Sequence, residues 1–400
     1  MKAHYEMKKA ACVGAVCIAT YAVGYFFRSI LSVYTPQMLA STLFTKEGIA
    51  LLSSVYMISY AAGQLVNGVL GDYIKSKYMV LMGMLTGGSG LLLFAFVSPG
   101  ILQAMCFFLV GFGLSMLRGP LVKIISENSL PRYARISCSL LSMSPSLGAL
   151  TASVASLFIR WDRVFAAAGI TAYIAAALSF ILLTVLEKRG MIVQLTGTRD
   201  KGHRLDILGV FRLPDFVRVF FLMLITEVTG TAIGFWIPTY LAERLQFPEA
   251  AASMVYSGMS VAKVFTPVLC LILLKFFREN WLRMMGSMFM AAAALTLAMI
   301  PVGAAWPNAL LFAVSTVAAG IASSVVWCVY IPGLAKSGKV SSANGVLDCM
   351  GYCGAASANM LFAVVITNWG WNAALAVWAA IFVAGVVITV LPGKGKKAGK

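Results

Sequence analysis

The hydrophobic positions of this chain are gathered in long runs rather than in regular alternation with polar positions. Apolar stretches of roughly 20 residues or more follow one another along the sequence, with short polar connections between them. A bilayer core needs about 20 apolar residues in one helix, so each run is long enough to cross a membrane. The runs predict twelve spans, at about 11–39, 48–71, 78–98, 101–127, 135–159, 164–186, 215–242, 250–275, 282–302, 306–334, 341–367 and 370–391.

Composition places nearly all of the chain in the membrane. Of the 400 residues, 60% are hydrophobic and 11% are charged, whereas a soluble protein keeps about a quarter of its residues charged. This excludes an ordinary soluble enzyme, and we expect no enzymatic activity. No Gly-rich loop ending in Gly-Lys-Ser or Gly-Lys-Thr occurs, so we expect no ATP-driven pump domain and look to a gradient for any driving force.

The net charge of +17 reports topology rather than nucleic-acid binding. The basic residues lie in the short connections, as the positive-inside rule requires, and they are not interleaved with aromatic residues in a patch. With both termini in the cytoplasm, nearly all of them fall on the inside. We therefore expect a multi-pass protein of the cell's inner (plasma) membrane with both termini cytoplasmic. The outer connections then hold only Lys46, Arg160, Arg163 and Arg244.

The cysteines and histidines do not suggest a metal or redox site. All eight cysteines lie in or beside apolar runs, and Cys349 and Cys353 are four residues apart on one helix face. We interpret them as small packing residues rather than as disulfides or ligands. The only histidines are His4 and His203, both near segments expected to be cytoplasmic. We predict no metal site and no cofactor.

The longest polar stretch divides the chain into two halves of six spans each. The predicted organisation is an N-terminal bundle over 1–187, a cytoplasmic linker over 188–214, and a C-terminal bundle with a short basic tail over 215–400. Pro36-Gln-Met-Leu39 has a counterpart in Pro238-Thr-Tyr-Leu241, which suggests duplication. An all-α membrane fold of two pseudo-symmetric six-helix bundles is typical of secondary transporters, which bind their cargo near the midplane between the repeats.

Three sequence motifs resemble known transporters. Gly68-Val-Leu-Gly71-Asp72-Tyr-Ile-Lys75-Ser-Lys77-Tyr78 resembles the signature loop of the major facilitator superfamily, with Tyr73 at the usual basic position. Tyr25-Phe-Phe-Arg28 and Trp236-Ile-Pro238-Thr239-Tyr240-Leu241 are similar to the organophosphate:phosphate antiporter branch, which carries glycerol phosphate and sugar phosphates. The resemblance implies a secondary transporter that works by alternating access.

One position departs from that branch. The branch has a second arginine in the seventh span, facing the first-span arginine across the substrate phosphate, and here Gly230 occupies its place. A single guanidinium suits a carboxylate or a less highly charged ester, unless Lys263 or Arg118 supplies the second positive charge.

Arg28 is the main candidate for binding the substrate. It lies near the middle of the first span, with Tyr21, Tyr25 and Ser32 at helical spacing, so a polar stripe faces inward. Ionisable groups inside a membrane are taken as functional or paired, and we favour anion binding over an arginine satisfied by helix carbonyls. Further candidates for substrate contact, on spans expected to border the cavity, are Tyr25, Tyr60, Trp236 and Tyr330.

Three charged residues of the C-terminal half form a candidate coupling network: Glu227, Lys263 and Asp348. Glu227 is a candidate for proton coupling or cation recognition, and a salt bridge to Lys263 is an equally weighted alternative. Asp348, four residues from Asn344 on one helix face, is expected to pair with Lys263 or to line the path, with pairing favoured.

Asp72 sits at a helix end, where the resemblance implies a latch between the two halves. Ser341 and Ser342 begin the eleventh span with good N-cap chemistry, and a helix N-terminus attracts a carboxylate. We group Lys77 and Arg118 with Asp72 as gate residues, although Arg118 also suits the cavity. Lys123 and Glu127, four residues apart, are expected to pair along one helix face.

The sequence thus favours a secondary transporter of a small organic anion, either an organophosphate or a carboxylate. The expected partners are that anion, the lipid bilayer, and protons or inorganic phosphate as the coupling species, with the protein acting as a monomer. A proton-coupled exporter of drugs or organic cations, with Glu227 and Asp348 as the recognising acids, is one alternative. A non-transporting membrane sensor of organophosphates is another.

Overall fold

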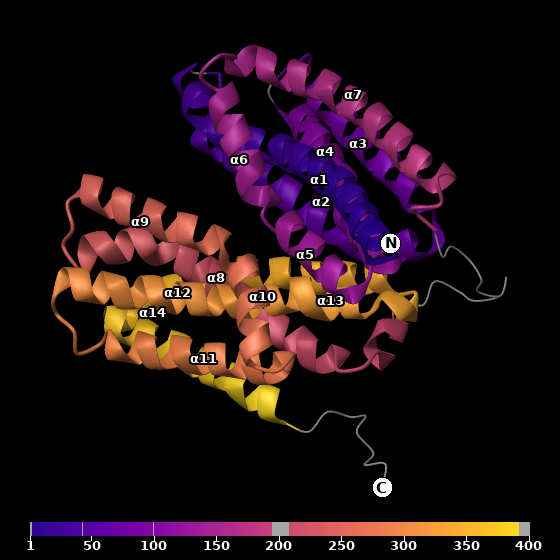
Figure 1. Ribbon diagram of the computed structural model, residues 1–400. Helices are drawn as coiled ribbons and strands as arrows, with labels where there is room; N and C mark the ends of the chain where they lie inside the picture. Colours follow the sequence, from indigo (N-terminus) through magenta and orange to yellow (C-terminus); the bar gives the residue numbers. More distant parts are fainter. Residues whose placement is uncertain (1, 42, 99, 194–207, 392–400) are drawn as a thin grey trace, which may run out of the picture. The chain divides into compact units, whose positions relative to one another are not determined.

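The computed structural model describes residues 2–41, 43–98, 100–193 and 208–391, which are almost entirely helical (Figure 1). Seven helices come from the first half of the chain. They are α1 (Lys2–Ala40), α2 (Lys46–Tyr73), α3 (Ser76–Phe94), α4 (Ile101–Asn128), α5 (Pro131–Leu141), α6 (Ser144–Ala155) and α7 (Trp161–Lys188). Pro145 lies in the first turn of α6, where a proline, which lacks the N–H that would continue the preceding helix, is well tolerated. Helices α5 and α6 together form one span over Pro131–Ala155.

The second half is also built of helices, and two of its spans are interrupted by a bend or a turn. A short turn, η1 (Leu208–Arg212), leads into α8 (Phe216–Glu243). Helices α9 (Glu249–Val264) and α10 (Thr266–Phe276) bend by 52° at Phe265, two residues before Pro267. The remaining elements are α11 (Trp281–Ala298), α12 (Ala305–Val325), the π-helical turn η2 (Val326–Tyr330), α13 (Ile331–Gly333), η3 (Ala335–Ser337) and α14 (Val340–Val390).

The prediction of a twelve-helix membrane fold is confirmed. Among the described residues, ten helices are long and apolar enough to cross a membrane, and the bent α9–α10 pair makes an eleventh. Helix α14 has 51 residues, a length of about 76 Å at 1.5 Å per residue, which exceeds two bilayer cores. Gly370, with φ 76° and ψ −178°, divides α14 into the two spans that the sequence predicts.

The helices form two compact units, each described here by itself. The first unit holds the chain up to Val210 together with Ile331–Cys349. In it, α1 packs against α4, α5, α6 and α7, while α3 lies against α4 and α7. The second unit holds Phe211–Tyr330 and the chain from Met350 onward. Its α12 contacts α8, α9, α10 and α11.

The start of α14 enters the first unit through a glycine crossing with α2. A Cβ atom built on Gly68 would lie 2.8 Å from the Cα of Gly345, and one built on Gly345 would lie 2.2 Å from the carbonyl oxygen of Gln64. Only residues without side chains let two helix backbones approach this closely. The crossing therefore fixes the register of α14 on α2.

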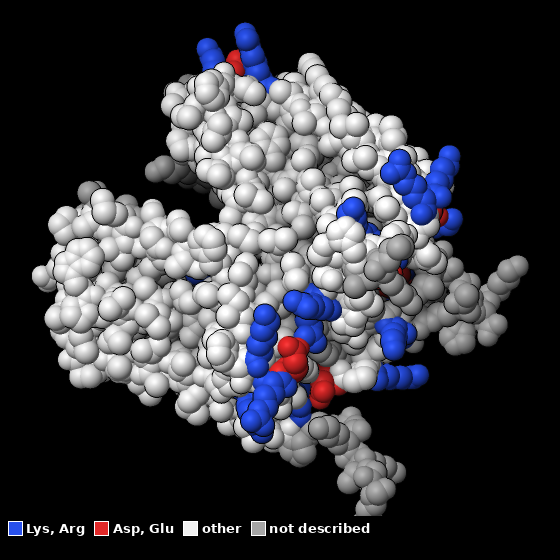
Figure 2. All heavy atoms as spheres, in the orientation of Figure 1, with Lys and Arg blue, Asp and Glu red and all other residues white. Residues whose placement is uncertain are grey.

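Charged side chains lie mainly at the ends of the helices. On the face shown in Figure 2, blue and red atoms gather at these ends, and the long flanks of each unit are almost entirely uncharged. The arrangement is what a bilayer requires, because apolar flanks face the acyl chains and charged groups stay near water.

Substitution of Gly370 tests the break in α14. We expect Gly370→Ala to lower the free energy of unfolding by about 1–3 kcal/mol, because a residue with a Cβ is strained at this φ and ψ. The measurement is the apparent thermal unfolding midpoint of the purified protein in detergent. The control is Gly303→Ala, whose new methyl group would meet nothing within 4 Å and should be nearly neutral. Equal midpoints for the two variants would contradict the prediction.

Candidate functional site

Arg28, in the middle of α1, is surrounded by aromatic rings. Its Cζ atom lies 5.3 Å from the ring centroid of Tyr25, 5.7 Å from that of Tyr56 and 4.9 Å from that of Tyr60. Its Nη1 donates a hydrogen bond of 3.5 Å to the Tyr25 hydroxyl. The rings of Tyr56 and Tyr60 are stacked on α2, with centroids 5.8 Å apart. Cation–π contacts of this kind hold a guanidinium in place without neutralising its charge.

A cavity of about 460 Å³ opens beside this arginine. Its polar wall consists of Arg28, Ser29, Ser32, Thr35, Ser53 and Tyr56. The buried Tyr56 hydroxyl has no hydrogen-bond partner among the described residues, and leaving such a group unsatisfied costs about 1–3 kcal/mol. The cavity thus offers a cation and several hydroxyls to a small polar ligand.

The sequence analysis names Tyr60 as a candidate for substrate contact but assigns no role to Tyr56. Their spacing of four residues in an apolar helix places both rings on one face, and that spacing was the available signal. The structure shows that Tyr56 also lines the cavity beside Arg28, whereas Tyr25 and Tyr60 hold the guanidinium through ring contacts.

A buried ion pair lies near the tyrosines that surround Arg28. Nη1 of Arg118 on α4 lies 3.0 Å from Oδ1 of Asp348 on α14, with side chains only 14% and 7% exposed. The Asn344 amide donates to the other carboxylate oxygen at 3.4 Å. The favoured expectation, that Asp348 pairs with Lys263, is corrected: its partner is Arg118.

Arg118 lies near the tyrosines around Arg28 rather than at Asp72. It lies within electrostatic range of Tyr21, Tyr25 and Tyr60, and Asp348 lies within range of Arg28 as well. Two arginines and one aspartate are therefore gathered around the tyrosines.

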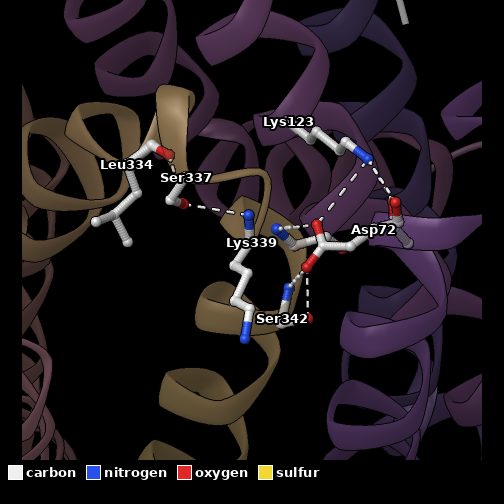
Figure 3. A network of polar contacts seen from close by, with 8 residues as sticks. Asp72, Lys123, Leu334, Ser337, Lys339 and Ser342 are labelled. Carbon is white, nitrogen blue, oxygen red and sulfur yellow. Dashed lines mark hydrogen bonds and ion pairs between the residues drawn. The ribbon is translucent and has the colours of Figure 1, made fainter. Parts of the chain in front are cut away.

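Asp72, near the end of α2, caps the first turn of α14 (Figure 3). Its two carboxylate oxygens accept hydrogen bonds from the backbone N–H of Ser341 at 3.1 Å and of Ser342 at 3.0 Å, and the Ser342 hydroxyl donates to it too. The N-terminal end of a helix carries a partial positive charge, so a carboxylate is stabilised there.

Lys123 completes this cluster in a way that the sequence does not predict. Its Nζ donates to the carbonyl oxygens of Gly71 at 3.1 Å and Asp72 at 3.2 Å, and lies 4.0 Å from an Asp72 carboxylate oxygen (Figure 3). The expected pairing of Lys123 with Glu127 is thus replaced by capping of the last carbonyls of α2, which have no partner within the helix. One oxygen of Glu127 is buried and accepts no hydrogen bond from the described residues.

Lys77 lies outside the Asp72 cluster. Its Nζ is 2.6 Å from an oxygen of Glu187 and stands over the rings of Tyr78 and Phe180. It therefore ties the start of α3 to the end of α7. The grouping of Lys77 and Arg118 with Asp72 is corrected, because the structure gives the three residues separate partners.

In the second unit, Glu227 on α8 lies within electrostatic reach of Lys263 at the end of α9. Its Cγ atom packs against Gly351, where a Cβ would lie 2.9 Å away. One turn further along α8, a Cβ on Gly230 would meet no atom within 4 Å. The place of the second arginine is thus open space.

The two aromatic candidates of the second unit differ. Trp236 packs against Phe235 and Trp371, and its buried indole N–H has no hydrogen-bond partner among the described residues. The Tyr330 hydroxyl donates to the carbonyl oxygen of Pro214 at 2.8 Å. Tyr330 is therefore a packing residue, and Trp236 is the better candidate for substrate contact.

Comparison with known proteins gives a family. The sequence profile of the Major Facilitator Superfamily matches residues 17–329. The Membrane sensor protein UhpC of Salmonella typhimurium is 23% identical over 258 residues, which span 59% of this chain and 58% of that protein. UhpC of Escherichia coli is 29% identical over 76 residues, 19% of this chain and 17% of that protein. The chain thus matches less than two thirds of these relatives.

Solved structures agree on the fold. FucP in the outward conformation superposes with a TM-score of 0.75 at 14% identity, covering 94% of this chain and 97% of FucP. The human organic anion transporter MFSD10 gives a TM-score of 0.69 at 11% identity, covering 95% of this chain and 99% of MFSD10.

Removal of one partner tests the Arg118–Asp348 pair. We expect Arg118→Met to destabilise the protein by about 3–5 kcal/mol, because it leaves a buried carboxylate uncompensated. The double variant Arg118→Met/Asp348→Leu should recover most of this loss. Thermal unfolding in detergent measures both. The control is Arg132→Met, which changes an exposed arginine. The prediction is contradicted if Arg118→Met is as stable as this control.

Proposed function

This chain belongs to the major facilitator superfamily, a family of transporters, and on that premise we propose that it moves a small organic anion across the membrane by alternating access. We also propose that the protein is located in the inner (plasma) membrane as a monomer, with both termini in the cytoplasm. The observation that carries the proposal is Arg28, held by three tyrosines beside a polar cavity.

The charges around the cavity favour a singly charged cargo. Arg118 forms a salt bridge with Asp348, and Lys263 lies within electrostatic range of Glu227, so an acid acts on each of these cations. A single arginine held among the tyrosine rings suits a carboxylate or a singly charged ester better than a doubly charged phosphate. Gly230, in the place of a second arginine, supports the same choice.

Arg28 suits such a cargo by its shape as well as by its charge. A planar guanidinium donates two parallel hydrogen bonds to a carboxylate or phosphate, and the tyrosine rings hold this guanidinium at the cavity wall. The Tyr56 hydroxyl, which no described residue satisfies, supplies a further hydrogen bond to the cargo.

The two acid–base pairs are the proposed coupling elements. Protonation of Asp348 or Glu227 would release the cation beside it, and a cargo or a counter-substrate bound to that cation would do the same. Either event links the state of the pairs to occupation of the cavity. Protons and inorganic phosphate are the candidate coupling species.

The Asp72 cluster is the proposed gate. Its carboxylate joins a helix of the first half of the chain to the first turn of α14, which comes from the second half. Contacts of this kind stabilise the conformational state in which they form, and they must break when the transporter changes state.

A second candidate function has a specific observation in its favour. The curated relatives are both named membrane sensor proteins. A protein of this kind would bind the anion at Arg28 without moving it. The exporter of organic cations is less well supported, since Asp348, one of its two recognising acids, is engaged by Arg118.

Counterflow in proteoliposomes tests the anion proposal. We expect a small monocarboxylate or a singly charged ester to exchange faster than inorganic phosphate, glycerol phosphate or an organic cation. Arg28→Gln should weaken binding of the preferred anion by about 10- to 150-fold, the loss of one charge-assisted hydrogen bond of about 1.5–3 kcal/mol.

The control is Arg163→Gln, which removes an exposed arginine at the start of α7 and should leave exchange unchanged. Binding of the anion without any flux would support the sensor instead. Exchange of a cation that survives Arg28→Gln but is lost in Glu227→Gln would favour the exporter.

The gate is tested by Asp72→Asn. We expect it to shift the balance of conformational states by about 2 kcal/mol, or about 30-fold, because the neutral amide loses its attraction to the helix end. The measurement is the exchange rate at saturating cargo, which should fall while binding of cargo is retained. Asp162→Asn, at the exposed Arg160–Asp162 pair, is the matched control. An unchanged rate in Asp72→Asn would refute the gate.

A further inference from the structure

The second unit carries a groove on its flank, between α11 and the end of α14. The two helices run antiparallel: a Cβ on Gly286 would lie 2.5 Å from Oγ1 of Thr389, and the rings of Phe289 and Phe382 are 6.2 Å apart. Gly286 and Gly385, which have no side chain, let the two helices come close together, and a depression lies beside their line of contact. Its volume is about 490 Å³.

Polarity changes along this groove. At its mouth, at the start of α11, stand Asn280 and Arg283, both exposed. Two turns deeper the walls are Met290 and Val386, and Met290 is half exposed. The distance from Asn280 to Met290 is about 15 Å along the helix, which matches a polar headgroup and the first part of an acyl chain.

The mouth carries donors for an anion. Arg283 is the charged residue of the groove lining, and no described acid pairs with its side chain. The side-chain oxygen of Asn280 accepts from the backbone N–H of Arg283 at 3.0 Å, and the amide nitrogen of this exposed side chain is a further donor. Figure 2 shows other basic side chains at this end of the unit, where α10, α11 and α14 meet.

We propose that this groove binds one anionic phospholipid. Its phosphate would lie at Arg283 and Asn280, and one acyl chain would follow Met290 and Val386. A zwitterionic lipid brings no net negative charge to Arg283, and a free phosphate makes no use of the apolar walls. Basic pockets between spans near the membrane surface select anionic headgroups in this way. The inference is independent of the cargo proposed above.

Native mass spectrometry of the full chain in detergent tests the site, with phosphatidylglycerol and phosphatidylcholine of equal chain length as probes. We expect phosphatidylglycerol to bind about fivefold more tightly, the effect of one arginine near the surface. Arg283→Gln should remove this preference. Ser287→Phe, which fills the groove without changing the charge, should lower the binding of both lipids.

The matched control is Arg278→Gln, an exposed arginine of the same end that does not line the groove, and it should keep the preference. Thermal unfolding of each variant checks that it is folded. Inorganic phosphate added in excess should not displace the lipid. Displacement by phosphate, or an undiminished preference in Arg283→Gln, would overturn the proposal.

Discussion

The cost of holding charge away from water governs this molecule. An ionised group in a low-dielectric interior must be neutralised, hydrogen bonded, or held by oriented dipoles or ring faces, and three places in the first unit show these solutions. Arg118 and Asp348 neutralise each other, Asp72 rests on the dipole of a helix end, and Arg28 lies among aromatic faces. The polar architecture of the first unit follows from these three solutions.

The three solutions differ in what they leave for a ligand. An ion pair at 3.0 Å uses up the charge of both partners, whereas ring faces leave the charge of a guanidinium intact. For this reason Arg28, rather than Arg118, is the arginine that we propose binds the anion. The glycine crossing of α2 and α14 is equally necessary, because it brings Asp348 into the first unit and within reach of Arg118.

Much of the fold could be read from the sequence because the bilayer imposes a length on every helix. The apolar runs gave all twelve spans, and the N-cap chemistry at Ser341 and Ser342 pointed to a carboxylate at the start of α14. The partner of Asp348 could not be found in this way. Arg118 lies 230 positions away, and only the packing of α14 against α4 makes the two residues neighbours. The predicted partner of Lys123 was wrong for a related reason. The spacing of four residues on one helix pointed to Glu127, but it carries no information about the last carbonyl groups of α2, to which Lys123 donates.

The empty space beside Gly230 has a consequence for how this lineage can change. Every glycine codon is one base away from an arginine codon, and a Cβ atom at this position would meet no atom within 4 Å. A single nucleotide change could thus add an arginine to α8 at this position. The charge of the solute that we propose for this transporter could therefore change in evolution through residue 230 alone, without a change in the fold.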